Sequence, residues 1–408
     1  MNLRIMLTIG MVALMALPSG ALSEDNARRQ DPDSRSGYRL GGFVIQPELS
    51  LGVGYNTNIL LSDTGETASG FVIIAPSVRI DSDWNRHALR LEAGGEAGVF
   101  THDMDDAYLD GKLALTGQID VLRSFWITLD AGIEHGHEAR GGDDVPGLAA
   151  EPVRFLKASG GLSAELRVSP MRVRPYVAVR RFDYSDVDLI GGGQSNQDDR
   201  DRTEMEAGAE LGFRISRAYE VFIRSSLLAT DYVAAVDDNG ANRDSLSFSG
   251  SAGLRVRLSR LLEGVASAGV VYRQFDDVAF SDGAEVEADL ELTWRPTPRL
   301  EFSAALSRGF RESTVATAGD VIDSEVSIEA AYELTRRLKL RASGGYAHAD
   351  FRGADQTEMI ARFGIGADWE ARRGLTLSPG YEFSMRTSDI AGRDYVVHQV
   401  MINADYKF

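Results

Sequence analysis

The chain has 408 residues, a formal net charge of −18 and no cysteine. The lack of cysteine excludes disulfides, thiol catalysis and thiolate metal sites, and the negative charge argues against nucleic acid as a partner. After residue 23 no segment carries 18 or more apolar residues in a row, which argues against membrane-spanning helices.

The N-terminus has the pattern of an export signal. Arg4 provides a positive start, residues 5–17 are apolar, and small residues lead to Ser23. We predict a signal peptide over residues 1–23, with cleavage after Ser23 or, alternatively, Ala21; an uncleaved interfacial helix is the other interpretation. Residues 24–41 are charged and lack periodicity, so we expect a flexible periplasmic lead-in there.

Residues 42–408 alternate between apolar and polar positions in a series of hairpins, with five to seven apolar positions on each face. The first predicted strand shows Phe43, Ile45, Pro47, Leu49, Leu51, Val53 and Tyr55 on one face, and the last shows His398, Val400, Ile402, Ala404, Tyr406 and Phe408. A tilted strand needs about ten residues to cross hydrocarbon, which fits these faces. We predict an all-β domain over residues 42–408, a transmembrane antiparallel up-and-down β-barrel of about 18 strands. Sixteen strands, or a soluble sandwich or propeller, are the alternatives.

Tight turns alternate with long polar loops along the chain, for example Ser169-Pro170-Met171 with residues 186–202. In outer-membrane barrels the short turns are periplasmic, which places both termini on that side. Trp84, Trp126, Trp294 and Trp369 all lie beside short turns, as expected at a membrane interface, although the parity of Trp126 points inward. We expect a second aromatic girdle at the loop ends, made by Tyr55, Tyr108, Tyr184, Tyr232 and Phe310. Pro76, Pro175 and Pro379 fall inside predicted strands, where they would mark bulges or strand ends.

The faces opposite the apolar ones carry charges in two sectors. Three arginines lie on one predicted inward face: Arg172, Arg174 and Arg180. Four carboxylates lie on two later strands: Glu287, Asp289, Glu325 and Glu329. We predict that these seven residues line a pore and set up a transverse field that guides charged solutes. The alternative is that the charges pair across neighbouring strands and fill the lumen.

The sequence offers no catalytic constellation and no strong metal motif. His135-Gly136-His137-Glu138 places two imidazoles on one strand face, which could hold a metal ion with Asp103, Asp105 and Asp106. Spacing alone does not define coordination geometry, so we interpret this stretch as a solvated loop end. We therefore predict no catalytic residue, no metal and no cofactor.

Two short motifs carry a resemblance to a known family. Gly42-Phe43, Pro47, Gly54-Tyr55, Asn58 and Ile59 are similar to the opening of an outer-membrane beta-barrel porin family, and Tyr406-Lys407-Phe408 resembles the signal that barrel-assembly machinery reads. The resemblance implies a Sec-exported barrel in the bacterial outer membrane, in contact with its lipid and with the assembly machinery through Tyr406 and Phe408. Such proteins are often encoded with exopolysaccharide export systems, which implies polysaccharide export components as partners.

We therefore expect a channel or export conduit for polar solutes, with polysaccharide as one cargo implied by the resemblance. Two other classes stay open. One is a non-conducting structural or adhesion barrel that works through its external loops. The other is a barrel-embedded enzyme that modifies lipid, for which the sequence shows no nucleophile–base pair.

Overall fold

A computed structural model of the protein describes residues 37–408, except 103–104, 139, 143–144, 146–148, 314 and 316–317. The predicted signal peptide and residues 24–36 of the lead-in lie outside the described residues. Just before the barrel, β1 (Tyr38–Leu40) folds back onto the start of the next strand, pairing Leu40 with Phe43. Among the described residues no helix is long and apolar enough to cross a membrane.

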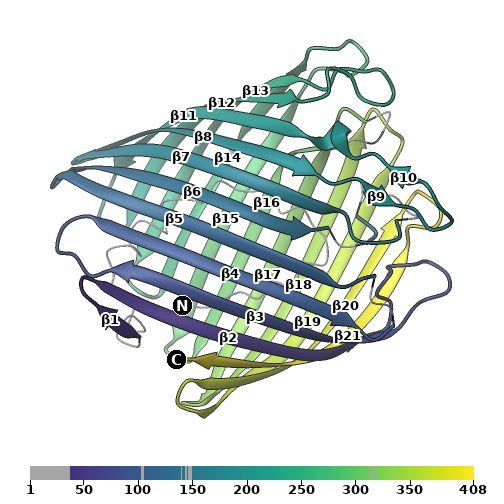
Figure 1. Cartoon of the computed structure of the whole chain (residues 1–408). Coiled ribbons are helices and arrows are strands. Elements are labelled where there is room, and N and C mark those ends of the chain that lie inside the picture. Colours follow the sequence, from purple (N-terminus) through teal and green to yellow (C-terminus); the bar gives the residue numbers. More distant parts are fainter. Residues whose placement is uncertain are drawn as a thin grey trace.

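Eighteen antiparallel strands form the barrel (Figure 1). They are β2 (Phe43–Asn56), β3 (Ser69–Ser82), β4 (Ala88–Phe100), β5 (Tyr108–Leu122), β6 (Phe125–His137), β7 (Arg154–Val168), β8 (Met171–Tyr184), β11 (Arg202–Arg214), β12 (Tyr219–Tyr232), β13 (Ser245–Leu258), β14 (Leu262–Phe275), β15 (Gly283–Thr297), β16 (Leu300–Glu312), β17 (Asp320–Thr335), β18 (Leu338–Arg352), β19 (Thr357–Arg372), β20 (Leu375–Ser388) and β21 (Tyr395–Lys407). The loop after β8 adds β9 (Val187–Asp188), β10 (Gln194–Ser195) and the 3-10 helix η2 (Asp198–Arg200).

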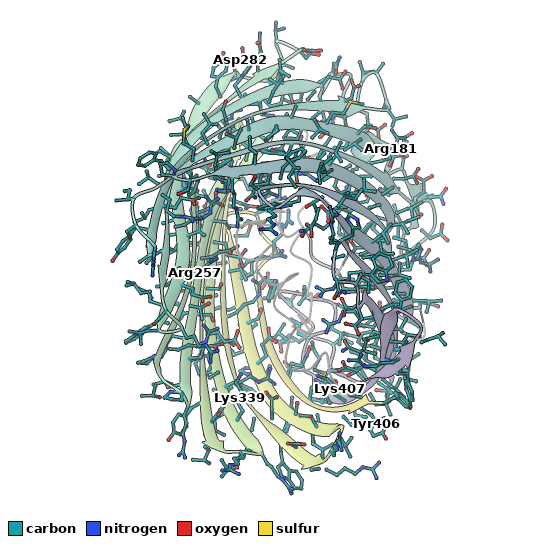
Figure 2. All side chains as sticks on the ribbon, turned by 90° about the vertical axis from the view of Figure 1, so that its left-hand side faces the viewer. Arg181, Arg257, Asp282, Lys339, Tyr406 and Lys407 are labelled. Carbon is teal, nitrogen blue, oxygen red and sulfur yellow. The ribbon has the colours of Figure 1, made fainter. Side chains whose placement is uncertain are left out.

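The sheet closes between its first and last strands. β2 pairs with β21 from Glu48 opposite Lys407 to Asn56 opposite Gln399. Closure gives every strand two neighbours, as a backbone surrounded by lipid requires. The predicted all-β barrel of 18 strands is therefore confirmed. Figure 1 places β1 and the C-terminus at the short-turn end, and Figure 2 shows an oval cross-section seen from that end.

The two faces of the wall follow the predicted alternation. On the outer face Val53 and Ile402 are more than half exposed, and Trp369 is half exposed, as expected for side chains that meet lipid. Trp126 instead points inward, as its parity indicates; it is 4% exposed, and the Arg167 guanidinium lies 4.6 Å from its ring. Three of the four tryptophans therefore belong to the short-turn girdle.

The predicted second aromatic girdle is largely wrong. Tyr55 is exposed, but Tyr184 is buried in a small apolar cluster formed by the loops. The Tyr108 hydroxyl donates to Glu96 at 2.7 Å, and the Tyr232 hydroxyl donates to Glu312 at 2.8 Å. Phe310 lies beside Arg352, 4.8 Å from its guanidinium. These rings cover buried charges near the loop end, which strand periodicity does not reveal.

Each proline inside a strand coincides with a gap in one hydrogen-bonding ladder. The β3–β4 register stops at Ile74 and resumes at Ser77, so Pro76 lies in the gap. The β7–β8 and β19–β20 registers skip Pro175 and Pro379 in the same way, while the ladders on the other side of both prolines continue. The missing N–H is thus confined to one side of each strand.

Inward aromatic rings lie flat because glycines stand opposite them. Tyr176 of β8 pairs with Gly208 of β11, and Phe222 of β12 pairs with Gly253 of β13. A Cβ atom at either glycine would come within 2.6 Å of the ring atoms. Glycine at these two positions therefore lets the rings cover the wall instead of projecting across the lumen.

Candidate functional site, the charged interior of the barrel

The short-turn half of the interior holds an arginine cluster, formed by Arg172, Arg224 and Arg255 with Glu210 and Glu220. Arg172 Nε donates to Glu220 at 2.9 Å, and its guanidinium also binds Glu210. Arg255 reaches the same two carboxylates at 3.0 and 2.6 Å. Arg224 donates to the other oxygen of Glu210 at 3.0 Å. Glu210, only 2% exposed, is thus bound by three guanidinium groups, which offset the cost of its burial.

The other two predicted arginines also lie beside glutamates of the next strand. Arg180 donates to Glu204 at 3.0 Å and to Glu206 at 3.2 Å. Arg174 stands directly opposite Glu210 in the β8–β11 register. The charges of this sector are therefore largely balanced within the wall itself.

The carboxylate sector on β15 and β17 is different. Glu287, Asp289, Glu325 and Glu329 are all half-buried, and within the described part of the chain none of them forms an ion pair. The strand between them, β16, places Ser307 opposite both Asp289 and Glu325, and its Arg308 binds Glu285. Glu287 accepts a hydrogen bond from the Ser249 hydroxyl at 3.3 Å. Arg224 attracts Glu287 and Asp289 from a distance, but within the described part of the chain no cation forms an ion pair with these four carboxylates.

The seven predicted residues thus fall into two groups. The structure brings Asp289 and Glu325 to either side of Ser307, and it brings Arg172 and Arg180 to glutamates of neighbouring strands. Between the two groups the wall runs through β11 to β14. The arginines pair with glutamates across neighbouring strands. The four carboxylates form no ion pair among the described residues, so they are the part of the wall that could produce a field across the lumen.

Near the loop end the wall splits between β15 and β16. Their pairing runs up to Ala288 opposite Arg308 and then stops, although β15 extends five residues beyond this pair and β16 extends four. β16 stays paired with β17 to its end, Glu312 opposite Asp320. The tip of the β16–β17 hairpin has therefore separated from β15 as a unit.

A buried group of charges holds the separated tip, and sequence analysis did not find it. Glu312 of β16 accepts from Tyr232 of β12 and binds Arg273 of β14. Asp320, fully buried, accepts two hydrogen bonds from Arg352 at 2.6 and 2.8 Å and lies 3.6 Å from Arg273. We call Arg273, Glu312, Asp320 and Arg352 the mouth cluster.

The parity of the mouth cluster shows how the tip is placed. Glu312, Asp320 and Arg352 occupy positions that continue the lipid-facing rows of their strands, marked lower down by Leu306, Val326 and Tyr346. Arg273 belongs to the inward row of β14, opposite Gly283. The tip therefore overlaps the inner side of the β12–β15 wall and narrows the mouth. Charges at lipid-facing positions were the signal that could have revealed it.

The loop at this tip is fastened by one arginine. Arg243, in the loop between β12 and β13, donates to the carbonyl oxygens of Ser313, Ala318 and Val315 at 2.6, 3.0 and 3.2 Å. Its Nε also donates to Asp237 at 2.8 Å. Burial alone would raise the pKa of Asp237, but the backbone N–H of Ala241 and the Arg243 guanidinium hold that pKa below its usual value.

The motif residue Asn58 has a structural role at the closing strands. It is fully buried, and its amide nitrogen donates to the carbonyl oxygens of Ser62 at 2.8 Å and Val396 at 3.4 Å. The Asn58 side chain also accepts from the Ser62 N–H at 3.0 Å. It therefore ties the loop after β2 to β21 where the barrel closes.

The histidine stretch contacts neighbouring protein groups, and Asp103, one of its candidate partners, lies outside the described residues. His137 Nδ1 lies 2.9 Å from the Asp110 carboxylate, and the centroid of its ring lies 4.0 Å from that of Tyr108, with the two rings tilted. His135 Nδ1 lies 3.1 Å from the Leu109 carbonyl oxygen. Among the described residues, no group of three or more histidines and carboxylates has the arrangement of a metal site.

The sequence profile of one family, described as "Putative beta-barrel porin 2", matches residues 31–408. The chain belongs to this porin family. It is accordingly a porin-like β-barrel of the bacterial outer membrane, as predicted. No curated protein matches the chain.

The comparison with solved structures gives several matches. OpdO of Pseudomonas aeruginosa is 15% identical, with 89% of this chain and 97% of that chain covered and a TM-score of 0.46. A BenF-like porin from Pseudomonas fluorescens Pf-5 is 7% identical, with 90% and 100% covered and a TM-score of 0.47. The copper transporter OprC is 11% identical, with 91% and 81% covered and a TM-score of 0.49.

Proposed function

We propose that this porin conducts small polar solutes through a water-filled lumen and favours cations over anions. The observation that carries the proposal is the unpaired carboxylate sector on β15 and β17. Glu287 and Asp289 lie on one side of β16, and Glu325 and Glu329 lie on the other.

Solvation requires water at this level of the barrel. An ionised carboxylate without a counter-charge costs many kcal/mol in a dry environment, and it is stable only where water or mobile cations reach it. The same four groups sit close enough to add their potentials, while the arginines opposite are already neutralised by glutamates. The net field in the lumen is therefore negative, and cations should be enriched there.

The test is ion selectivity in a planar bilayer under a salt gradient. The wild type is compared with a variant in which Glu287→Gln, Asp289→Asn, Glu325→Gln and Glu329→Gln are combined. A wall potential of a few kT enriches cations about tenfold, so we expect the permeability ratio to fall toward one in this variant. The matched control removes four exposed loop carboxylates, by Asp63→Asn, Glu66→Gln, Asp188→Asn and Asp355→Asn, and should keep most of the selectivity.

Two results would contradict the proposal. Wild-type barrels that insert but carry no current would indicate a filled lumen and favour a structural or adhesion barrel that works through its loops. Equal selectivity in the wild type and the lumen variant would show that these carboxylates do not set the field. Lipid hydrolysis by the purified protein would instead indicate the enzyme alternative.

We also infer that Tyr406 and Phe408 form the signal that the barrel-assembly machinery reads. The Phe408 ring is half exposed beside the Tyr406 ring, with centroids 4.8 Å apart, so it is accessible on the finished barrel. Phe408→Ala should lower the amount of folded barrel in the outer membrane, whereas Phe125→Ala, beside the turn between β5 and β6, should not do so to the same extent. Equal assembly of Phe408→Ala and the wild type would refute this role. Polysaccharide export, with its partners, rests on the resemblance alone.

A further inference from the structure

The short turns carry a ring of arginines. Eight turns join the strands at this end, and seven of them contain arginine, while the same turns contain one acidic residue, Asp83. The eight arginines, named here the rim arginines, are Arg86, Arg123, Arg217, Arg260, Arg299, Arg336, Arg337 and Arg373. Such a concentration is unexpected in a chain with a net charge of −18.

The rim arginines are exposed and available. All eight are exposed, and among the described residues none of them forms an ion pair. Arg86 donates one hydrogen bond, to the Asp120 carbonyl oxygen at 2.8 Å. Asp83 is bound by Arg39 at 2.7 Å. The positive charge of the rim is thus not consumed within the protein.

Two carboxylates near the rim are bound by other arginines. Glu301 is bound by Arg295 and Asp368 by Arg341, each at 2.7 Å. The guanidinium groups of the rim arginines are therefore open to an anionic partner from outside the chain.

The position of the rim favours lipid. The turns are too short to extend far from the membrane, and Trp84, Trp294 and Trp369 beside them are 44 to 50% exposed, as interfacial aromatic residues are. The rim arginines also surround the barrel instead of gathering on one side, because the seven turns that hold them join strand pairs from β3–β4 to β19–β20 around the closed sheet. A single docked protein would need a patch, whereas a shell of lipid meets the whole circumference.

We propose that the rim arginines bind the phosphate groups of anionic phospholipids in the periplasmic leaflet. Guanidinium groups form paired, charge-assisted hydrogen bonds with phosphate. The field of an anionic leaflet adds about 1 kcal/mol for each basic residue near its surface, and salt screens it. The ring would hold anionic lipid around the barrel and anchor it at a fixed depth.

The test compares two variants with the same net charge. The rim variant combines Arg217→Gln, Arg260→Gln, Arg299→Gln and Arg337→Gln. The control adds four negative charges at exposed positions in the loops, by Thr64→Glu, Asn239→Asp, Ser281→Glu and Ala391→Glu. Each protein is folded into vesicles of phosphatidylcholine with or without phosphatidylglycerol, and retained lipid is measured by native mass spectrometry after detergent extraction.

We expect the wild type and the control to retain phosphatidylglycerol over phosphatidylcholine by about fivefold or more, the equivalent of about 1 kcal/mol. The rim variant should lose this preference, and high salt should weaken it in the wild type and in the control. Equal retention of both lipids by the wild type, or an unchanged preference in the rim variant, would overturn the proposal. Binding of polyglutamate by the wild type without any lipid preference would assign the rim to an acidic polymer instead. Conductance does not enter this readout, so the result is independent of the proposed channel function.

Discussion

The two ends of the barrel have opposite charge and use arginine in opposite ways. The nine long connections contain 23 aspartates and glutamates and four arginines, whereas the eight short turns contain one aspartate and eight arginines. The negative charge of the chain therefore comes from the loop end. The barrel has an electrical polarity along its axis as well as an inner and an outer face.

The difference reflects what a connection can fold against. Every loop arginine is paired: Arg140 with Asp106, Arg200 with Glu138, Arg243 with Asp237 and Arg393 with Glu358. Long loops can fold over the mouth, and their arginines fasten them there. Tight turns have no such freedom, so the rim arginines stay exposed. An arginine in this chain is thus structural at the loop end and available for binding at the turn end.

The largest expected effect concerns which end faces the cell exterior. The chain has no cysteine, so a single introduced thiol reports on its own position. Ala391→Cys, in a loop, should react fully with a membrane-impermeant maleimide on intact cells. Arg336→Cys, in a turn, should react only after the outer membrane is permeabilised. Labelling of Arg336→Cys, but not of Ala391→Cys, on intact cells would place the short turns on the cell exterior.

Breaking the mouth cluster should give the next largest effect. Arg273→Met leaves Glu312 and Asp320 without one of their buried partners, and such a loss costs about 3–5 kcal/mol. We expect a lower unfolding temperature, measured by the heat-dependent shift in gel migration, and larger or noisier single-channel current as the β16–β17 tip detaches.

The control for this prediction removes the charges together. Arg273→Met combined with Glu312→Gln and Asp320→Asn should be less destabilised than Arg273→Met alone, because no buried charge is left unpaired. A single variant as stable as the wild type would contradict the role given to the cluster.

A smaller effect separates the two kinds of arginine. Arg243→Met leaves three carbonyl oxygens without their donor and Asp237 without its ion-pair partner, and a buried group left unsatisfied costs about 1–3 kcal/mol. Arg260→Met, at the rim, should change the unfolding free energy by less than about 0.5 kcal/mol. Both changes in the free energy of unfolding are to be measured by urea titration in vesicles of the same lipid. Equal losses of unfolding free energy in the two variants would contradict this difference between loop and rim arginines.

The smallest effect is a pH dependence at the loop end. The folded pKa of Asp237 is lower than its unfolded value, so its contribution is complete above the ordinary aspartate pKa of about 3.9 and disappears as pH falls through the lower value. The loop between β12 and β13 should therefore stay ordered from neutral pH down to mild acid, as measured by hydrogen exchange of residues 237–241. Asp237→Asn should remove the acid transition. A transition near pH 6 would indicate that a titratable group other than Asp237 controls the order of this loop.

The fold could be predicted because barrel topology is local. Alternation marks each strand, its parity gives the face, and each strand pairs with the next along the chain. Even the inward position of Trp126 followed from parity. The prolines disturbed one ladder each and left the strands intact.

The contacts of the interior could not be predicted in the same way. Arg172 binds carboxylates from three other strands, and their heights depend on the register between strands, which alternation does not define. Glu312 meets Arg273 only because β16 leaves β15, a change in tertiary structure with no local signature beyond a charge at a lipid-facing position. Tyr232 and Tyr108 were assigned to the lipid interface by their residue type, but their hydroxyls donate to Glu312 and Glu96.

A water-filled, negatively charged lumen is tested most directly by the reversal potential of single wild-type barrels in a planar bilayer with a potassium chloride gradient. The unpaired carboxylates Glu287, Asp289, Glu325 and Glu329 predict a steady current whose reversal potential has the sign of cation selectivity. A current that favours chloride, or folded barrels without current, would contradict a wet, negatively charged lumen.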